Sequence, residues 1–318
     1  MERCNLSFPR SNQGIGLFYL FHGSLYILPY TLCIAAMSDM SLRAQNCYKI
    51  MIFMGLVDMV QLGFSCFVPG VMSIIGSPFC PDTLYWNRVL AAMAWSSWCS
   101  YSAVSVMLAM DRFIQGRSAS LHLFRGSKIY IWMGICLVYG LSQGIVHLTP
   151  LASFTYLADH GHYVSGKSRL GFFIFLSHNV GTAVVLTVLY SVTVVRYKRK
   201  LSQIRATSHG TLSTMRSLLY TSLVICSLTW AAAIGYVLAP RLQSIWPFRI
   251  SIMTIAHVAW QGISGGNCIV YLVVNHTVRK KVVHLLAKAW QRSSHQQIPS
   301  RTDDFDLEAG HLVSSSLL

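Results

Sequence analysis

The pattern of apolar and polar positions divides the chain into seven long apolar stretches with short polar segments between them. The stretches cover residues 14–36, 50–75, 89–111, 129–149, 170–195, 217–239 and 250–274. A helix needs about 20 mostly apolar residues to cross a bilayer, so each stretch can form one span, and the second and fifth are long enough to be tilted or kinked. The pattern predicts an all-α integral membrane protein whose seven-transmembrane helix bundle occupies residues 14–274.

The segments on either side of this bundle differ in character. Residues 1–13 have neither the basic start nor the cleavage site of a signal peptide, so we expect the first span to be retained. Residues 275–292 predict an interfacial amphipathic helix, with a solvated basic tail as the alternative. Its apolar face consists of Val278, Val282, Leu285, Leu286 and Ala289. Residues 293–318 are polar and Ser-rich, which is typical of a disordered tail.

Composition supports a membrane protein, and charge predicts its orientation. Only 11% of the residues are charged, against roughly 25% in soluble domains. A net charge of +15 would suggest nucleic-acid binding in a soluble chain. In a chain with membrane spans, the distribution of basic residues between the loops instead indicates the orientation in the membrane. Of the 25 Lys and Arg residues, 18 lie after the first, third, fifth and seventh spans. The positive-inside rule therefore places the N-terminus outside and the C-terminus in the cytoplasm. We expect the basic loops to contact the inner leaflet of the bilayer, and we expect no nucleic acid as partner.

Asp111, Arg112 and Phe113 lie where the third span meets the predicted cytoplasmic side. A charged pair at this depth is costly unless it is paired or solvated, so it can act as a latch whose Arg is released to a partner. The alternative is an ordinary positive-inside Arg beside a solvated Asp. In a seven-span chain with its N-terminus outside, we favour the latch.

This pair and the segment from Asn267 to Tyr271 resemble the Asp-Arg-Tyr and Asn-Pro-x-x-Tyr motifs of rhodopsin-like G-protein-coupled receptors. Phe113 replaces the Tyr, and Cys268 replaces the Pro. The sixth span has Trp230 without a following Pro inside the helix, and the first span lacks the usual Asn. The chain is therefore not a mainstream member of that class.

A narrower resemblance rests on Cys47-Tyr-Lys-Ile-Met51 followed by Gly55-Leu-Val-Asp58. These residues resemble the second-span signature of the nematode serpentine receptors of class T (Srt), a family of chemosensory seven-transmembrane receptors. Further similar positions are Leu25, Tyr26, Cys33, Gly70, Gly76, Cys80, Pro81 and the run Leu108–Arg112. Asp111 departs from the Asn that more often precedes this Arg in the family. The resemblance is densest over residues 14–115.

Asp58 lies about nine residues into the second span, and a carboxylate at that depth is a candidate functional group. In rhodopsin-like receptors the comparable Asp helps to bind sodium and couples to activation. We expect Asn267 and Ser264 of the seventh span as its partners, and we group Asp58, Asp111, Arg112, Asn267 and Tyr271 as the activation switch. The alternative for Asp58 is a protonated side chain that only bonds a neighbouring helix.

Two features of the predicted outer side bear on processing. Cys4 and Cys80 are the only cysteines expected there, which predicts a disulfide between them, with a free Cys80 as the alternative. Asn5 starts a glycosylation sequon on the same side. The sequon at Asn275 should face the cytoplasm and stay unmodified.

An outer-half pocket is predicted to hold a small apolar or weakly polar ligand, because aromatic residues and a few hydrogen-bonding groups gather there without a convincing acid. Packing or interfacial positions are the alternative for each residue. On the seventh span, His257, Gln261, Ser264, Cys268 and Tyr271 form a polar stripe that must face the bundle. The candidate ligand residues are Trp95, Trp98, Tyr101, His178, Trp230, His257, Trp260 and Gln261. Further candidates for the lining of the same pocket are Tyr26, Phe64, Phe67, Asn179 and Tyr236.

Other function classes lack their sequence features. The His residues show no metal-ligand spacing, and no Lys lies within a span to carry retinal, so we expect no enzyme, metal site or cofactor. A transporter or channel is the alternative, although broken helices and buried charge relays are missing. We expect a chemosensory receptor in the plasma membrane of a sensory neuron, with a small molecule and a heterotrimeric G protein as partners.

Overall fold

A computed structural model describes residues 11–76, 81–115, 123–124, 126–149, 152–165, 168–203, 209–245 and 251–296. Its long helices are α1 (Gln13–Met37), α3 (Asn46–Leu62), α5 (Pro81–Gln115), α6 (Lys128–Leu148), α7 (Arg169–Gln203), α8 (His209–Leu242), α9 (Ile252–Val273) and α10 (His276–Gln296). A π-helical segment, η1 (Gly63–Phe67), continues α3 into α4 (Val68–Ile75). The shorter elements are α2 (Met40–Arg43), the 3₁₀ turn η2 (Gln243–Ile245) and the strands β1 (Phe154–Leu157) and β2 (His162–Ser165).

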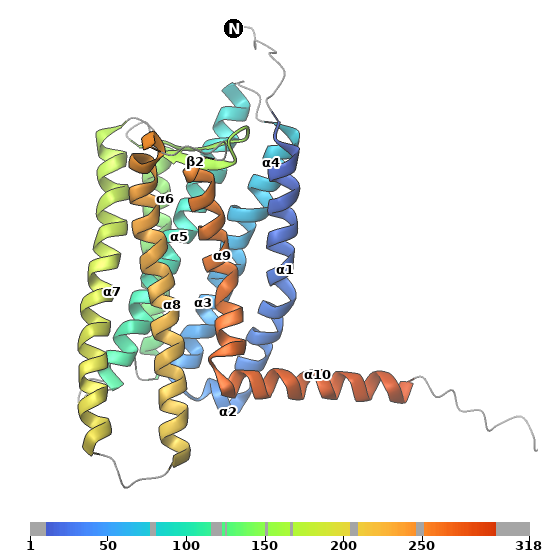
Figure 1. The fold of residues 1–318 in the computed structure, drawn as a ribbon, viewed down its shortest axis with the longest axis vertical. Helices are drawn as coiled ribbons and strands as arrows, with labels where there is room; N and C mark the ends of the chain where they lie inside the picture. The colour runs from blue at the N-terminus through green and yellow to red at the C-terminus, as the bar shows by residue number, and fades with distance from the viewer. Residues whose placement is uncertain are drawn as a thin grey trace, which may run out of the picture.

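These helices form a seven-helix bundle, with α3, η1 and α4 together serving as one membrane-crossing unit (Figure 1). The bounds agree with the predicted spans to within a few residues at most ends, while α5, α7 and α8 extend further. α10 starts at the foot of α9 and runs sideways away from the bundle, and the strands cover the opposite end (Figure 1). We call these the α10 end and the hairpin end.

Five of the described helical segments are long and apolar enough to cross a membrane by length and composition alone. They are Gln13–Met37, Asn46–Ile75, Lys128–Leu148, Arg169–Arg196 and Leu219–Leu242. The two remaining bundle helices, α5 and α9, carry buried polar residues such as Ser100, His257 and Asn267. Neighbouring helices shield these side chains from lipid, which is why a central helix can be more polar than its surroundings.

The antiparallel pair of β1 and β2 differs from the expected all-α architecture. The two strands are joined by a turn in which Gly161 has φ +72°, a left-handed conformation that favours glycine. Phe154 and Tyr156 of β1 are buried while Thr155 and Leu157 are half-buried, so the alternation is that of a strand lying on a packed surface.

Close packing between α5 and α6 depends on small residues. A Cβ atom on Gly140 would lie 2.7 Å from the Ser96 carbonyl oxygen and 2.8 Å from the Ser100 amide nitrogen. Gly144 faces the same side, against Ser96. This is the small-residue interface by which membrane helices approach closely.

α10 is anchored at its start and along its first turns. Asn275 is fully buried and accepts a hydrogen bond from the amide of Val278, so it acts as the N-cap. Val278 and Val282 are buried. Lys281 contacts Asp39 at 2.9 Å, and hydrogen bonds from Ser41 and then Lys281 lower the pKa of Asp39 to about 2.

Candidate functional site

An aromatic cavity of about 20 Å³ lies inside the bundle near the hairpin end. In this measure a water molecule needs roughly 10–15 Å³, so the cavity holds about one water. Its wall comes from α5, α7, α8, α9 and β1. The lining residues are Trp95, Trp98, Phe154, Phe175, Asn179, Tyr236 and Trp260, all of them uncharged.

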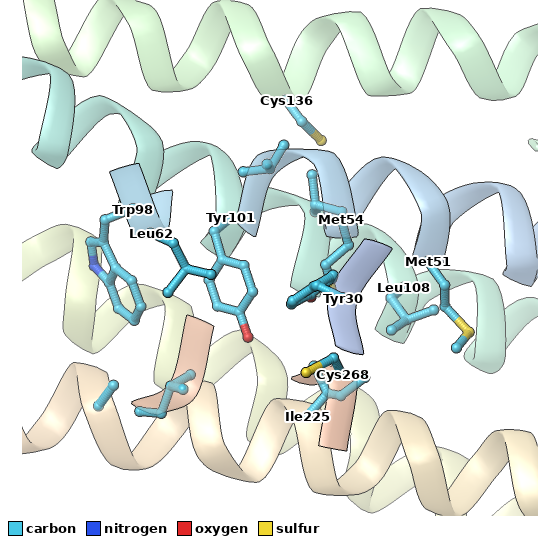
Figure 2. Packing of buried hydrophobic residues seen from close by; sticks show 14 of the residues in the cluster. Tyr30, Met51, Met54, Leu62, Trp98, Tyr101, Leu108, Cys136, Ile225 and Cys268 are labelled. Carbon is cyan, nitrogen blue, oxygen red and sulfur yellow. The ribbon is translucent and has the colours of Figure 1, made fainter. Parts of the chain in front are cut away.

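The predicted ligand residues fall into three groups. Trp95, Trp98 and Trp260 line the cavity. Tyr101 stacks on Trp98 with ring centroids 5.8 Å apart, and Figure 2 shows these two rings together on α5. His178 packs edge-on against Trp95 at 5.4 Å, just behind the wall. His257 and Gln261 are fully buried on the side of α9 that faces η1.

Trp230 is the exception, because it lies outside the cavity and is 44% exposed. It lines a larger crevice of about 300 Å³ between α7 and α8, together with Tyr190 and Cys226. Tyr236, six positions further along α8, does line the cavity. At about 100° per residue, six positions turn the helix to a different face, so the two aromatic residues cannot share one site.

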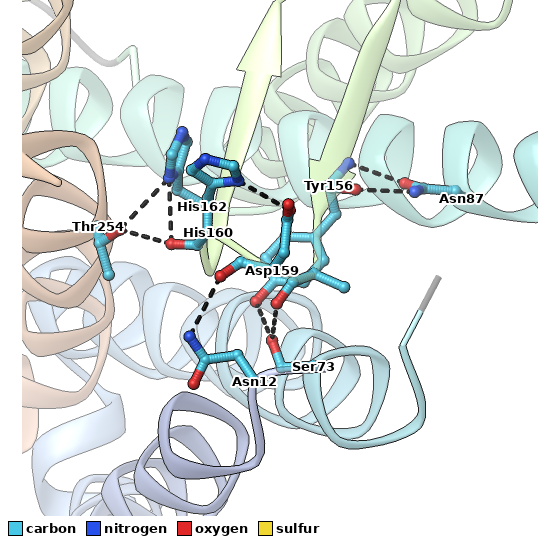
Figure 3. Close-up of polar contacts among 9 residues, drawn as sticks. Asn12, Ser73, Asn87, Tyr156, Asp159, His160, His162 and Thr254 are labelled. Atoms are coloured by element: carbon cyan, nitrogen blue, oxygen red, sulfur yellow. Dashed lines mark hydrogen bonds and ion pairs between the residues drawn. The ribbon is translucent and has the colours of Figure 1, made fainter. Parts of the chain in front are cut away.

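The hairpin closes the bundle above this cavity, and side chains from several helices hold its backbone (Figure 3). Asn87 of α5 donates to the Tyr156 carbonyl at 2.9 Å and accepts from the Tyr156 amide at 2.8 Å. Tyr19 of α1 donates to the Gly161 carbonyl at 2.5 Å. Thr254 of α9 donates to the His160 carbonyl at 2.6 Å. These bonds fix the hairpin at β1 and at its turn.

The π-helical segment exposes backbone carbonyls that bind the other elements. The Ser65 carbonyl accepts from His257 Nε2 at 3.0 Å and from Gln261 Nε2 at 2.6 Å. The Phe64 carbonyl accepts from the Tyr163 hydroxyl at 2.7 Å. A π-helical turn leaves carbonyls without their usual partner, and π-bulges are frequent at functional sites. Here they link α9 and the hairpin to the second membrane-crossing unit.

A buried polar network below the cavity joins α1, α3, α5, α8 and α9. Asp58 accepts hydrogen bonds from the Tyr30 hydroxyl and, at 2.9 Å, from Asn267 Nδ2. The same amide is 3.2 Å from the Tyr101 hydroxyl, which in turn lies 3.1 Å from Thr229 Oγ1. All of these side chains are fully buried. Through Asn267, the network connects Tyr101, which stacks on the cavity residue Trp98, with the Asp58 carboxylate.

The structure thus brings Asp58 and Asn267 together, as expected, whereas Ser264 has another partner. Gln61 of α3 donates to Ser264 at 2.6 Å. Tyr271 is near the network, with its ring 6.4 Å from that of Tyr30, but its buried hydroxyl has no hydrogen-bond partner among the described residues. All five residues of the predicted α9 polar stripe are fully buried, so the stripe does face the bundle.

Asp111 and Arg112 form a buried ion pair at the α10 end, with Arg112 Nη2 2.5 Å from Asp111 Oδ2. Their side chains are 4% and 7% exposed, so the pair is not solvated. This geometry contradicts the alternative of a solvated Asp. Next to it, the Arg196 guanidinium lies 4.3 Å from the ring centre of Phe113, which joins α7 to the end of α5.

Three important residues were not among the predicted site residues. Phe175 lies one helical turn before His178 and Asn179, so its position on α7 was a usable signal. Phe154 belongs to the unpredicted hairpin, and no feature of the sequence indicated that Tyr30 would reach Asp58. Cys4, Asn5, Cys80 and the tail beyond residue 296 lie outside the described residues. Within the described ranges, no cluster of three or more His, Cys, Asp or Glu residues could hold a metal ion.

Comparison with known proteins identifies the family. The model of the serpentine-type seven-transmembrane G-protein-coupled receptor chemoreceptor family Srt matches residues 3–295. Serpentine receptor class T-55 of Caenorhabditis elegans is 24% identical over 281 residues, covering 86% of this chain and 75% of that protein. Squid rhodopsin has the same fold, with a TM-score of 0.69 at 12% identity over 94% of this chain and 97% of the rhodopsin chain. Fold and family are thus those of a multi-pass membrane receptor rather than an enzyme, and the chain belongs to the Srt family of serpentine chemoreceptors.

Proposed function

We propose that this receptor binds a small apolar or weakly polar molecule in the aromatic cavity and responds by activating a heterotrimeric G protein at the α10 end. The observation that carries the proposal is the position of Tyr101. It stacks on the cavity residue Trp98 and also belongs to the polar network of Asp58 and Asn267. A ligand that moves the cavity wall therefore acts on side chains of five helices at once.

The response needs two states that the ligand binds with different affinity. Rearrangement around Tyr101 changes the bonds of Thr229 on α8 and Asn267 on α9, the helices we expect to repack. The buried hydroxyl of Tyr271 has no partner among the described residues. A second helix packing that gave this hydroxyl a partner would be stabilised by the hydrogen bond gained. These contacts support Asp58, Asn267 and Tyr271 as parts of the switch.

At the α10 end, the switch releases Arg112. In the present packing its charge is neutralised by Asp111 within a buried site. Separation of the pair makes the guanidinium available to a G protein, with the basic segment 196–216, from the last turns of α7 to the first turns of α8, contributing further positive charge. The concentration of Lys and Arg at this end supports its assignment to the cytoplasm and the hairpin end to the outside of the plasma membrane.

The test uses the full chain expressed in reporter cells and exposed to a panel of volatile and soluble small molecules. We expect G-protein activation by at least one compound, and its loss in Arg112→Ala at matched surface expression. Arg43→Ala is the control, because Arg43 is an exposed basic residue near the same end. Full agonist response in Arg112→Ala contradicts the latch. Ligand-evoked current or uptake without G protein would instead establish a channel or transporter.

A further inference from the structure

Three indole groups line the aromatic cavity, but they differ in their hydrogen bonding. Trp98 donates its N–H to Asn179 Oδ1 at 3.1 Å. The N–H groups of Trp95 and Trp260 are fully buried, and neither has an acceptor within the described parts of the chain. Their side chains are only 3% and 4% exposed. Two hydrogen-bond donors of residues that line the cavity therefore have no acceptor among the described residues.

Both indoles are held in place by neighbouring rings. Trp95 packs against His147 at 5.3 Å and Phe175 at 5.4 Å between ring centroids. Trp260 is 5.9 Å from Tyr236 and 5.4 Å from His257. Rings enclosed in this way cannot turn their N–H groups towards solvent, so the donors stay directed into the protein interior. A buried donor without an acceptor is unfavourable, and binding an acceptor relieves that cost.

The remaining cavity wall restricts the chemistry further. It contains no carboxylate to neutralise a cation and no basic group to attract an anion. Asn179, the only amide among the lining residues, already uses its oxygen for Trp98 and donates its nitrogen to the Phe175 carbonyl. The other polar lining group, the Tyr236 hydroxyl, lies 3.1 Å from His257 Nδ1 and is therefore already hydrogen-bonded. The lining groups that lack a partner among the described residues are the two indole N–H donors, so the complementary molecule is neutral and supplies an acceptor.

We propose that Trp95 and Trp260 select a compact, neutral ligand with an oxygen acceptor, such as a ketone, ester or ether, and discriminate against the hydrocarbon of the same shape. This inference rests on the proposed function for the location of the site and adds the chemical class of the ligand. The small cavity requires that the aromatic side chains move apart to admit anything larger than water. The ligand oxygen then accepts from one indole N–H or from both.

The experiment compares matched pairs of probes on the purified full chain in lipid nanodiscs. One member of each pair has a carbonyl and the other has an exocyclic methylene in its place, as in cyclohexanone and methylenecyclohexane, with smaller pairs down to acetone and isobutene. Ultraviolet resonance Raman spectra report indole N–H hydrogen bonding directly. We expect a carbonyl probe to shift this band towards the bonded form, while its methylene partner leaves the band unchanged.

Variants assign the shift to the two residues. Trp95→Phe and Trp260→Phe keep an aromatic ring but remove the N–H. Each should weaken binding of the carbonyl probe by about threefold to tenfold, the range for one neutral hydrogen bond. Binding of the methylene probe should change less than twofold. Trp132→Phe is the matched control, because the Trp132 N–H bonds the Leu123 carbonyl near the α10 end.

The outcomes separate this inference from the proposed function. The proposed ligand class would be overturned if both members of every pair shifted the band equally, or if no carbonyl probe shifted it. Both outcomes are measured on the wild-type receptor, so they hold even if a variant fails to fold. A band already in its bonded form before any probe is added, and unchanged afterwards, would show a resident water only and would also overturn it. A carbonyl-dependent shift without G-protein activation would support the ligand class while contradicting the proposed signalling.

Discussion

At the scale of single residues, Tyr30 and Tyr271 make a matched pair. Both are fully buried and their rings are in edge contact, yet only Tyr30 has a hydroxyl partner, Asp58, among the described residues. Tyr30→Phe should lower the free energy of unfolding by roughly 1–3 kcal/mol, because it removes a donor from a buried carboxylate. Thermal unfolding of the detergent-solubilised receptor measures the change.

Tyr271→Phe is the comparison, and it should leave thermal stability unchanged or raise it, because the buried hydroxyl has no partner among the described residues. The same substitution should reduce ligand-driven G-protein activation if a second packing supplies a partner. A loss of stability equal to that of Tyr30→Phe would contradict this account of Tyr271.

We expect the hairpin to respond to pH through His162. Burial lowers the pKa of His162, whose Nδ1 lies 3.3 Å from Thr254 Oγ1; His160 and Asp159 are the other titratable groups acting on it. The neutral form is therefore favoured when the hairpin is closed. The free energy that neutral His162 contributes to the closed hairpin is fully present above the ordinary histidine pKa of about 6.5, and it decreases as the pH falls below that value.

We expect amide hydrogen-exchange protection factors of the hairpin to decrease between about pH 6.5 and pH 5 in wild type. His162→Gln should flatten this dependence, because glutamine does not titrate. Protection that stays constant in wild type over the same pH range would contradict a role for His162.

At the scale of elements, two glycines on α6 test the helix interface. Gly140 touches α5, whereas a Cβ atom on Gly134 would meet nothing within 4 Å. Gly140→Ala should destabilise the receptor by about 1–3 kcal/mol through overpacking. Gly134→Ala should stabilise it by roughly 0.5–1 kcal/mol through helix propensity. Thermal unfolding distinguishes the opposite signs, and equal shifts would show that α5 and α6 are not this close.

The hairpin depends on Asn87 for two backbone hydrogen bonds. Because the segment between α6 and α7 has no Cys, the disulfide that rhodopsin-like receptors place there cannot form, and Asn87 supplies a non-covalent clamp instead. Asn87→Ala should increase hydrogen exchange in β1 and β2. Asn46→Ala, which loses one bond to the Phe124 carbonyl near the other end, is the control and should leave the strands protected.

Elements also show what the sequence could and could not predict. Length and hydropathy located all seven bundle helices, because the bilayer sets both quantities. The α9 stripe was predictable since polar groups must avoid lipid. The sequence could not show that Trp230 lies apart from the cavity, because hydrophobicity does not specify how an apolar helix is rotated. The hairpin and η1 escaped prediction because their stability comes from contacts such as Tyr163 with Phe64, which are distant in the sequence.

At the scale of the whole molecule, the two sequons test orientation. If the hairpin end faces outside, Asn5 carries the glycan, and glycosidase treatment should shift wild type and Asn275→Gln but not Asn5→Gln. The structure adds a reason why Asn275 stays unmodified, since its side chain is buried as the α10 N-cap. A glycan that persists in Asn5→Gln and disappears in Asn275→Gln would reverse the orientation.

The hairpin, held by hydrogen bonds above a cavity with room for one water, has a consequence for the timing of a sensory response. A molecule arriving from that end waits for a transient opening, so its association rate falls in proportion to the open fraction. Departure uses the same opening, so residence is prolonged as well. Such a receptor would average a stimulus over time rather than follow its rapid fluctuations, and weakening the Asn87 clamp would shorten that averaging interval.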